Sequence, residues 1–271
     1  MVLNMKVLVG SPVSRHHAYC TKEYLESIKN LSYPNYDILL VDNSETEEWY
    51  NQIKESSGVK IVRHGYDKPT VKERMVACRN YLRSYALENG YDYFLDLDQD
   101  VIPPRDVIER LLSHKKDFVT GIYFNYFEKT KGNMKRMAVA YTWFAKDEEM
   151  EMQKNPEKLK HEYPTLYSAL VKTNWDFSKL MRPINEHEIK DGKLVKIRAS
   201  GSGCMLVSRK ALEAVAFRDN KEGGFDDVLF CFDLRDKGFE LFADCSVVCE
   251  HLTERPWQWT RVGNETKIVY K

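Results

Sequence analysis

The stretch Tyr91–Pro104, YDYFLDLDQDVIPP, places three carboxylates at alternating positions where an apolar run ends: Asp96, Asp98 and Asp100. A short apolar run that stops at turn residues is typical of a buried strand. Like charges held close together destabilise a fold unless something offsets them. These side chains therefore either spread into water or share a cation.

Asp98 and Asp100 are the pair that best suits a cation. Residues two apart in extended backbone point the same way, so both carboxylates offer oxygen ligands on one side of the chain. Mg²⁺ and Mn²⁺ both accept such ligands. The alternative is a solvated, aspartate-rich turn before proline. The apolar residues run directly into the acids without a glycine or serine spacer, which favours the metal site, although Asp96 and Asp98 remain an alternative pair.

Outward from this stretch, the first half of the chain alternates strands and helices. Apolar runs predict strands at 6–12, 36–42, 59–65, 91–98 and 117–127, and helical patterns predict helices at 18–31, 46–58, 70–90 and 103–116. This alternation predicts an α/β fold with a mostly parallel sheet flanked by helices. Ligands bind beyond the carboxyl ends of such strands. Ser11 and Asp42 end two of them, so we expect both near the aspartate cluster.

The second half of the chain is mixed. The sequence 194–215 predicts a strand, a glycine turn, a second strand and a helix; 225–238 predicts a helix, and 239–252 one or two strands. The charged segment 145–195 predicts a surface insertion or a helical excursion over the cleft. With no linker to divide the chain, we expect a single domain, 1–271, with a nucleotide-binding half, 1–125, and a smaller acceptor-binding and catalytic half, 126–271.

Composition narrows the class of protein. The 271 residues are 43% hydrophobic and 30% charged, enough for a sizeable core, and Lys plus Arg balances Asp plus Glu at 41 each. That balance gives no argument for a nucleic-acid partner. No run is long enough to span a membrane, and the N-terminus does not read as a signal peptide. Six scattered cysteines are expected to be reduced in a cytoplasmic protein, with peripheral membrane association left open. Cys245, Cys249 and His251 lack the second ligand pair of a zinc finger.

The stretch YFLDLDQDVIPP resembles the D-x-D motif of GT-A glycosyltransferases, and five further segments stand in the order of the inverting, family-2-like branch. VLVGSPVSR is similar to its first strand and nucleotide loop, and ILLVDNSE to its second strand. ACRNYLRSYALENG resembles the helix before the motif. SGSGCMLVSRKALEAV resembles its glycine-rich strand, and FDDVLFCFDLRDKGFELFADCSVVCEH its E-D segment with a later histidine. The resemblance covers about residues 5 to 255 and implies a Rossmann-like GT-A fold.

The resemblance also implies site residues. It implies a divalent cation, Mn²⁺ or Mg²⁺, bound by Asp98, Asp100 and His251, and nucleotide contacts from Ser11, Pro12, Arg15, Asp42, Arg79, Asp96 and Gln99. Asp96 lies inside the strand and is expected to face either the nucleotide or a basic partner. His16 and His17, near the first loop, are interpreted as solvated.

For the acceptor side, the resemblance implies that Asp227 is the general base and that Asp226 and Gly203 bind the acceptor. Acidic residues at a helix start are also ordinary caps. Asp226 replaces the usual glutamate and is one methylene shorter, which weakens its expected role more than that of Asp227. Gly201 and Gly203 either allow close approach of an acceptor or form a β-turn.

The implied reaction moves a sugar from a UDP- or GDP-sugar to a hydroxyl of a carbohydrate, lipid or protein, with inversion expected and retention left open. A sugar-nucleotide nucleotidyltransferase would need a glycine-rich, arginine-containing loop after the first strand, and GSPVSRHHA has one glycine. A non-catalytic nucleotide- or carbohydrate-binding protein of this fold would be expected to lose the acids, and Asp98, Asp100 and Asp227 are present.

Overall fold

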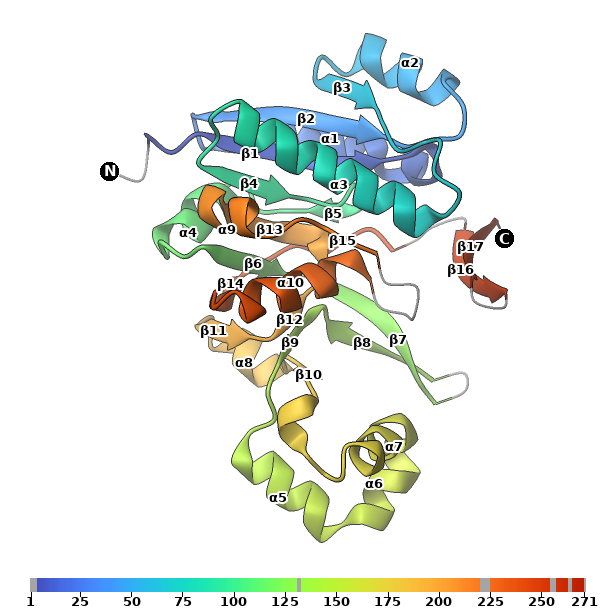
Figure 1. The fold of residues 1–271 in the computed structure, drawn as a ribbon, viewed down its shortest axis with the longest axis vertical. Coiled ribbons are helices and arrows are strands. Elements are labelled where there is room, and N and C mark those ends of the chain that lie inside the picture. Colours follow the sequence, from blue (N-terminus) through green and yellow to red (C-terminus); the bar gives the residue numbers. More distant parts are fainter. Residues whose placement is uncertain (1–3, 131–132, 220–224, 254–256, 263–264, 271) are drawn as a thin grey trace.

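A central eight-stranded sheet organises the chain (Figure 1). The computed structural model describes residues 4–130, 133–219, 225–253, 257–262 and 265–270. The sheet has the order β11-β14-β6-β13-β4-β1-β2-β3. Its strands are β1 (Val7–Val13), β2 (Tyr36–Asp42), β3 (Lys60–Arg63), β4 (Tyr93–Asp96), β6 (Phe118–Ile122), β11 (Leu194–Ile197), β13 (Met205–Ser208) and β14 (Leu241–Val248).

Most neighbouring strands run parallel, which confirms the predicted fold class. β4, β1, β2 and β3 are mutually parallel, and β14 is parallel to β6. The crossovers between the first strands are the helices α1 (Thr21–Lys29), α2 (Glu48–Ser56) and α3 (Val71–Glu88). β13 runs antiparallel between β4 and β6, with Met205 opposite Asp96. The short 3₁₀ helix η4 (Ser202–Cys204), just before β13, is thereby brought to the end of β4 where the aspartates lie.

Two apolar layers cover the sheet, because successive side chains in a strand point to opposite faces. Leu8 and Phe94 pack in one cluster with α3, α9 (Arg209–Ala214) and α10 (Asp226–Asp236). Val9 and Leu95 pack in the other cluster with α1, α2 and α4 (Val107–Ser113). The inner strands, such as β1, β6 and β13, are buried on both faces, which explains their nearly continuous apolar sequences.

Three elements differ from their predicted ranges. The run 117–127 divides at Tyr123 into β6 and β7 (Phe124–Thr130), and β7 pairs with β8 (Asn133–Ala138) in a separate hairpin. The first helical pattern begins as the 3₁₀ helix η2 (Arg15–Cys20) before α1. The helix predicted from Pro103 begins at Val107, because Pro103 and Pro104 form the turn before it.

The segment 145–195 is largely helical. It contains α5 (Lys146–Lys154), α6 (Pro156–Glu162), α7 (Pro164–Lys172), η3 (Phe177–Lys179) and α8 (Glu186–Lys190). Helices α5 to α7 lie beyond the β11 end of the sheet (Figure 1). They have an apolar cluster of their own, built on Phe144, Leu159, Leu170 and Phe177.

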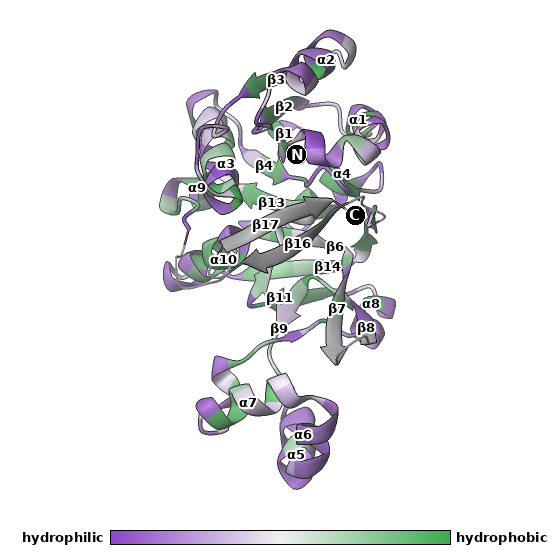
Figure 2. Ribbon diagram, turned by 90° about the vertical axis from the view of Figure 1, so that its right-hand side faces the viewer, coloured by the Kyte–Doolittle hydropathy of each residue, from purple (hydrophilic) through white to green (hydrophobic). Residues whose placement is uncertain are grey.

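The remaining strands form small sheets. β9 (Ala140–Thr142) pairs with β10 (Arg182–Pro183) and β12 (Ala199–Ser200), β15 (Glu250–His251) pairs with β5 (Val101–Ile102), and β16 (Trp257–Val262) pairs with β17 (Glu265–Tyr270). Figure 2 shows apolar residues concentrated in the central strands and polar residues on the outer helices. Among the described helices, none has the length and apolar character needed to cross a membrane.

Candidate functional site

A cavity of about 220 Å³ lies at the carboxyl ends of β1 and β4. The D-x-D turn, the end of β1, the first turns of α3 and α10, η4 and the end of β15 all contribute to it. Its lining includes Pro12, Asn43, Arg74, Arg79, Asp98, Gln99, Asp100, Tyr123, Ser202, Phe225, Asp226, Asp227 and His251. The structure therefore brings together the aspartate turn, the predicted base and the predicted metal histidine, which are distant in sequence.

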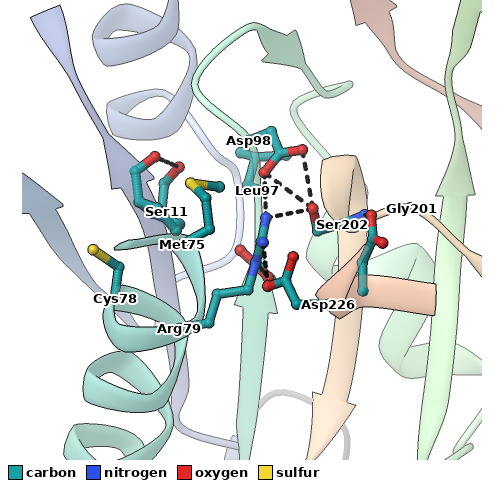
Figure 3. A network of polar contacts seen from close by, with 12 residues as sticks. Ser11, Met75, Cys78, Arg79, Leu97, Asp98, Gly201, Ser202 and Asp226 are labelled. Atoms are coloured by element: carbon teal, nitrogen blue, oxygen red, sulfur yellow. Dashed lines mark hydrogen bonds and ion pairs between the residues drawn. The ribbon is translucent and has the colours of Figure 1, made fainter. Parts of the chain in front are cut away.

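Arg79 lies at the centre of the polar network (Figure 3). Its guanidinium is buried and donates from Nε to Asp96 Oδ2 at 2.9 Å, from Nη1 to Asp226 Oδ2 at 2.7 Å and from Nη2 to Asp98 Oδ1 at 3.0 Å. Arg79 is carried by α3, and a capping box formed by Thr70 and Glu73 fixes the start of that helix. Although burial opposes its charge, the surrounding carboxylates hold the pKa of Arg79 well above its usual value.

One cation is too little for this number of carboxylates. Burial, reinforced by Asp98 and Asp226, raises the pKa of Asp96 to about 8 against the opposing effect of Arg79. Burial, together with Asp100 and Asp226, also raises the pKa of Asp98. At neutral pH the cavity therefore favours either a bound proton or an added cation.

Ser202 connects the D-x-D turn to the predicted base. Its Oγ accepts from Arg79 Nη2 at 2.5 Å and lies 3.1 Å from Asp98 Oδ2, to which it donates, while its backbone N–H donates to Asp227 Oδ2 at 3.2 Å. Sequence reasoning did not single out Ser202. The available signal was its place between Gly201 and Gly203 in the glycine-rich segment.

Asp227 has the environment of a proton acceptor. It lines the cavity at the first turn of α10, and its Oδ1 accepts from the backbone N–H of Val228 at 2.6 Å. Burial and the neighbouring Asp226 raise its pKa to about 7, against the opposing effect of Arg79. A carboxylate that titrates near neutral pH matches what general-base chemistry requires.

Asp100 and His251 meet through backbone pairing. His251 lies opposite Val101 where β15 pairs with β5, and its Nε2 is 3.3 Å from Asp100 Oδ2. Its Nδ1 lies 2.6 Å from the backbone oxygen of Phe124 and must donate to that carbonyl, which turns Nε2 toward the carboxylate. His17 Nε2 is 3.6 Å from the same carboxylate oxygen. Although burial works against ionisation, hydrogen bonds from both histidines hold the pKa of Asp100 well below its usual value.

The donor types suit the expected cation. Asp98, Asp100 and His251 line one cavity and present two carboxylates and an imidazole nitrogen, a set that Mn²⁺ accepts. The bond from His251 Nδ1 to a carbonyl is the kind of outer contact that orients a metal-binding histidine. Within the described ranges, no three His, Cys, Asp or Glu side chains are grouped so that they could hold a metal ion as they stand.

Three residues predicted to contact the nucleotide are fully buried instead. Ser11, Asp42 and Asp96 each have 0% of their surface exposed. Ser11 Oγ donates to the Pro12 carbonyl, Asp42 accepts from Ser44 and Arg63, and Asp96 takes the basic partner that was its alternative. These positions therefore act behind the cavity wall, and the expectation of direct contact needs correction.

The other predicted nucleotide residues are more varied. Pro12 and Gln99 line the cavity, and the Gln99 side chain accepts from Ser14 N at 2.9 Å and donates to Thr21 Oγ1 at 2.8 Å. Arg15 is exposed, and its Nε pairs with Glu45 at 3.3 Å outside the cavity lining. Gln99 therefore fastens the start of η2 and α1 onto the D-x-D turn.

Gly203 allows close approach of a protein side chain rather than an acceptor. A Cβ at Gly203 would lie 2.5 to 2.8 Å from ring carbons of Tyr123, and one at Gly201 would lie 2.0 Å from the Tyr123 hydroxyl. Tyr123 lines the cavity and makes an edge-on contact with His251, with ring centroids 5.4 Å apart. The expected acceptor role of Gly203 is corrected accordingly, and Tyr123 joins the site.

A larger cavity, about 640 Å³, lies elsewhere, between the β7–β8 hairpin and the α5–α8 segment. None of the predicted site residues lines it. In the described part of the chain, no residue of 145–195 lines the smaller cavity, so this segment is a helical excursion that does not cover the aspartate site.

Comparisons with known proteins agree with this architecture. The sequence profile of Glycosyl transferase family 2 matches residues 20–178, which include α3 and the D-x-D turn. The crystal structure of GalNAc-T7 with UDP, GalNAc and Mn²⁺ is similar in fold, with a TM-score of 0.57 at 11% identity over 91% of this chain. This chain spans 44% of the GalNAc-T7 chain.

A second structure, A197 from STIV, has a TM-score of 0.45 at 15% identity and covers 98% of this chain and 94% of its own. No curated protein sequence matches this chain.

Proposed function

The chain belongs to glycosyl transferase family 2, and from this premise we propose that it transfers a sugar from a UDP- or GDP-sugar to an acceptor hydroxyl with inversion, in a reaction that depends on a divalent cation. Its family and GT-A fold make it a glycosyltransferase. The single observation that carries the finer proposal is that Asp227 lines the same cavity as Asp98, Asp100 and His251.

Asp227 is proposed as the general base. It takes the proton of the acceptor hydroxyl, which attacks the anomeric carbon from the face opposite the diphosphate. A pKa near 7 leaves much of the carboxylate ionised at neutral pH and makes it basic enough to accept a proton. The N–H groups of Ser202 and Val228 support this role because each donates to one carboxylate oxygen and fixes its orientation.

Asp98, Asp100 and His251 are proposed to hold the cation, Mn²⁺ or Mg²⁺. When bound, the cation would supply positive charge, which would offset the negative charge that develops on the leaving diphosphate. Arg79 holds Asp98 from behind, and His251 is oriented by the Phe124 carbonyl. Arg74 also lines the cavity, and its buried Nε has no hydrogen-bond partner among the described residues, so it is a further candidate to contact an anionic donor.

The proposal is tested by calorimetric titration with UDP and with GDP, each with and without Mn²⁺, followed by transfer assays on a panel of nucleotide sugars. We expect Asp98→Ala to abolish metal-dependent nucleotide binding. Asp227→Asn should retain binding and lose about 10²-fold or more in turnover. Asp106→Ala, an exposed aspartate that precedes α4, is the matched control and should change neither quantity.

Binding of neither nucleotide by the wild-type protein, with or without metal, would refute the proposed donor. Turnover retained by Asp227→Asn would remove Asp227 as the base without affecting the donor assignment.

A further inference from the structure

Two imidazoles from distant parts of the chain converge on one carboxylate. His251 Nε2 lies 3.3 Å from Asp100 Oδ2, and His17 Nε2 lies 3.6 Å from the same oxygen. All three side chains line the same cavity. Their side chains are 8%, 22% and 9% exposed for His251, His17 and Asp100, so the arrangement is not a solvated surface pair.

The backbone holds both histidines in register with Asp100. The Leu252 N–H donates to the Asp100 carbonyl at 2.8 Å, and the Tyr19 hydroxyl donates to the Leu252 carbonyl at 2.9 Å. η2, which carries His17, is thereby tied to the segment that follows His251. Both histidines are therefore positioned by contacts of their own segments, through the Leu252 main chain on one side and the Tyr19 hydroxyl on the other.

Gln99 fastens η2 from the other side. Its amide accepts from Ser14 N and donates to Thr21 Oγ1, and the Thr21 hydroxyl in turn donates to the His17 carbonyl at 3.0 Å. The middle residue of the D-x-D turn thus fixes the loop that brings His17 above Asp100. This arrangement gives Gln99 a positioning role, beside the nucleotide contact expected from sequence.

The separations suit donors that share an ion. Two ligand atoms bound to one cation at about 2.1 Å lie about 3.0 to 3.4 Å apart, depending on whether the geometry is octahedral or tetrahedral. The observed separations from Asp100 Oδ2, 3.3 and 3.6 Å, lie close to that range. A second imidazole also changes the chemistry, because Mg²⁺ favours carboxylates, waters and phosphates whereas imidazole suits transition-metal ions.

We propose that His17 is a further protein ligand of the cation, beside Asp98, Asp100 and His251, and that the site therefore prefers a transition-metal dication such as Mn²⁺ over Mg²⁺ before any nucleotide binds. The inference rests on the proposed metal dependence. His16 provides a contrast within the same loop, because its Nε2 lies 3.3 Å from Glu45.

The test is Mn²⁺ binding to the nucleotide-free protein, measured by loss of the free-ion electron paramagnetic resonance signal, with Mg²⁺ as a competitor. We expect His17→Gln to lower Mn²⁺ affinity about tenfold or more and to reduce the preference for Mn²⁺ over Mg²⁺. His16→Gln, the matched control, should stay within about twofold of the wild type. Pulsed resonance should detect two directly coupled imidazole nitrogens in the wild type and one in His17→Gln.

The outcomes separate the inference from the proposed function. If the wild type binds Mn²⁺ with one coupled nitrogen, and His17→Gln binds equally well, His17 is not a ligand while the metal-dependent function stands. If neither protein binds Mn²⁺ even with UDP or GDP present, the proposed metal dependence fails together with this inference. Thermal unfolding of each variant checks that the loss is not one of folding.

Discussion

Arg79 illustrates how a single side chain organises the site. Its guanidinium contacts Asp96, Asp98 and Asp226 and is itself only 2% exposed. A buried charge is stable only when it is paired and hydrogen-bonded. The single positive charge of Arg79 is shared by carboxylates on the protein side of the cavity. The cavity therefore keeps more carboxylates than positive charges. That excess is the physical reason to expect a cation in the cavity.

Asp227 gives a pH-dependent prediction at the same scale. Its pKa is raised to about 7 in the folded protein, so ionising it costs stability as pH rises from about 4 to about 7. Asp227→Asn removes that cost. Relative to the wild type, the variant should therefore gain about 1 kcal/mol or more of unfolding free energy between pH 5 and pH 8, and little more above that. Urea unfolding at a series of pH values measures the difference.

Asp236→Asn is the control for this prediction. Asp236 lies at the end of the same helix, α10, and is exposed to solvent. Its stability difference from the wild type should stay level across the same pH range. A level difference for Asp227→Asn as well would contradict the raised pKa on which its role as base depends.

At the scale of elements, η4 packs against one aromatic ring, that of Tyr123, which joins β6 to β7. Gly203 faces Tyr123 so closely that a methyl group would overlap the ring at 2.5 Å. We expect Gly203→Ala to destabilise the fold by about 1 to 3 kcal/mol through overpacking and to displace Tyr123 from His251. Chemical denaturation of Gly203→Ala measures the cost.

A double-mutant cycle identifies the source of that cost. Tyr123→Ala alone should cost about 3 to 5 kcal/mol, because it leaves a cavity. The double variant should cost clearly less than the sum, since the alanine methyl then has room. Additive costs would mean that Tyr123 is not what Gly203 accommodates.

The secondary-structure elements also explain why part of this site could be predicted from the sequence and the rest could not. The strands carry continuous apolar sequence and end at turn residues, and the D-x-D turn follows one of them directly, so both were predictable from local pattern. The burial of Asp96 depends on Arg79 reaching it from α3, which is a tertiary contact without a local signal. Ser202 and His17 enter the site in the same way. The division at Tyr123 was missed because 117–127 carries no proline and no turn cluster near Tyr123 that would mark a break.

At the scale of the whole molecule, the buried apolar residues form clusters of unequal size. Two large clusters lie on either face of the central sheet, and a small one, built on Phe144, Leu159, Leu170 and Phe177, holds α5 to α7. Regions with little buried apolar contact open locally at lower free energy than the main core. We therefore expect amide hydrogens in α6 and α7 to exchange faster than those in β1 and β4.

Leu170→Ala tests this division. Leu170 is fully buried in the small cluster, so its truncation should cost about 2 to 5 kcal/mol of local stability. Hydrogen exchange followed by mass spectrometry should then show faster exchange in α5 to α7 and unchanged exchange in β1 and β4. Leu82→Ala, on the buried face of α3 in the main core, should speed exchange throughout the chain. If Leu170→Ala accelerates β1 and β4 as much as α7, the chain unfolds as one cooperative unit, and the helical excursion cannot move independently of the site.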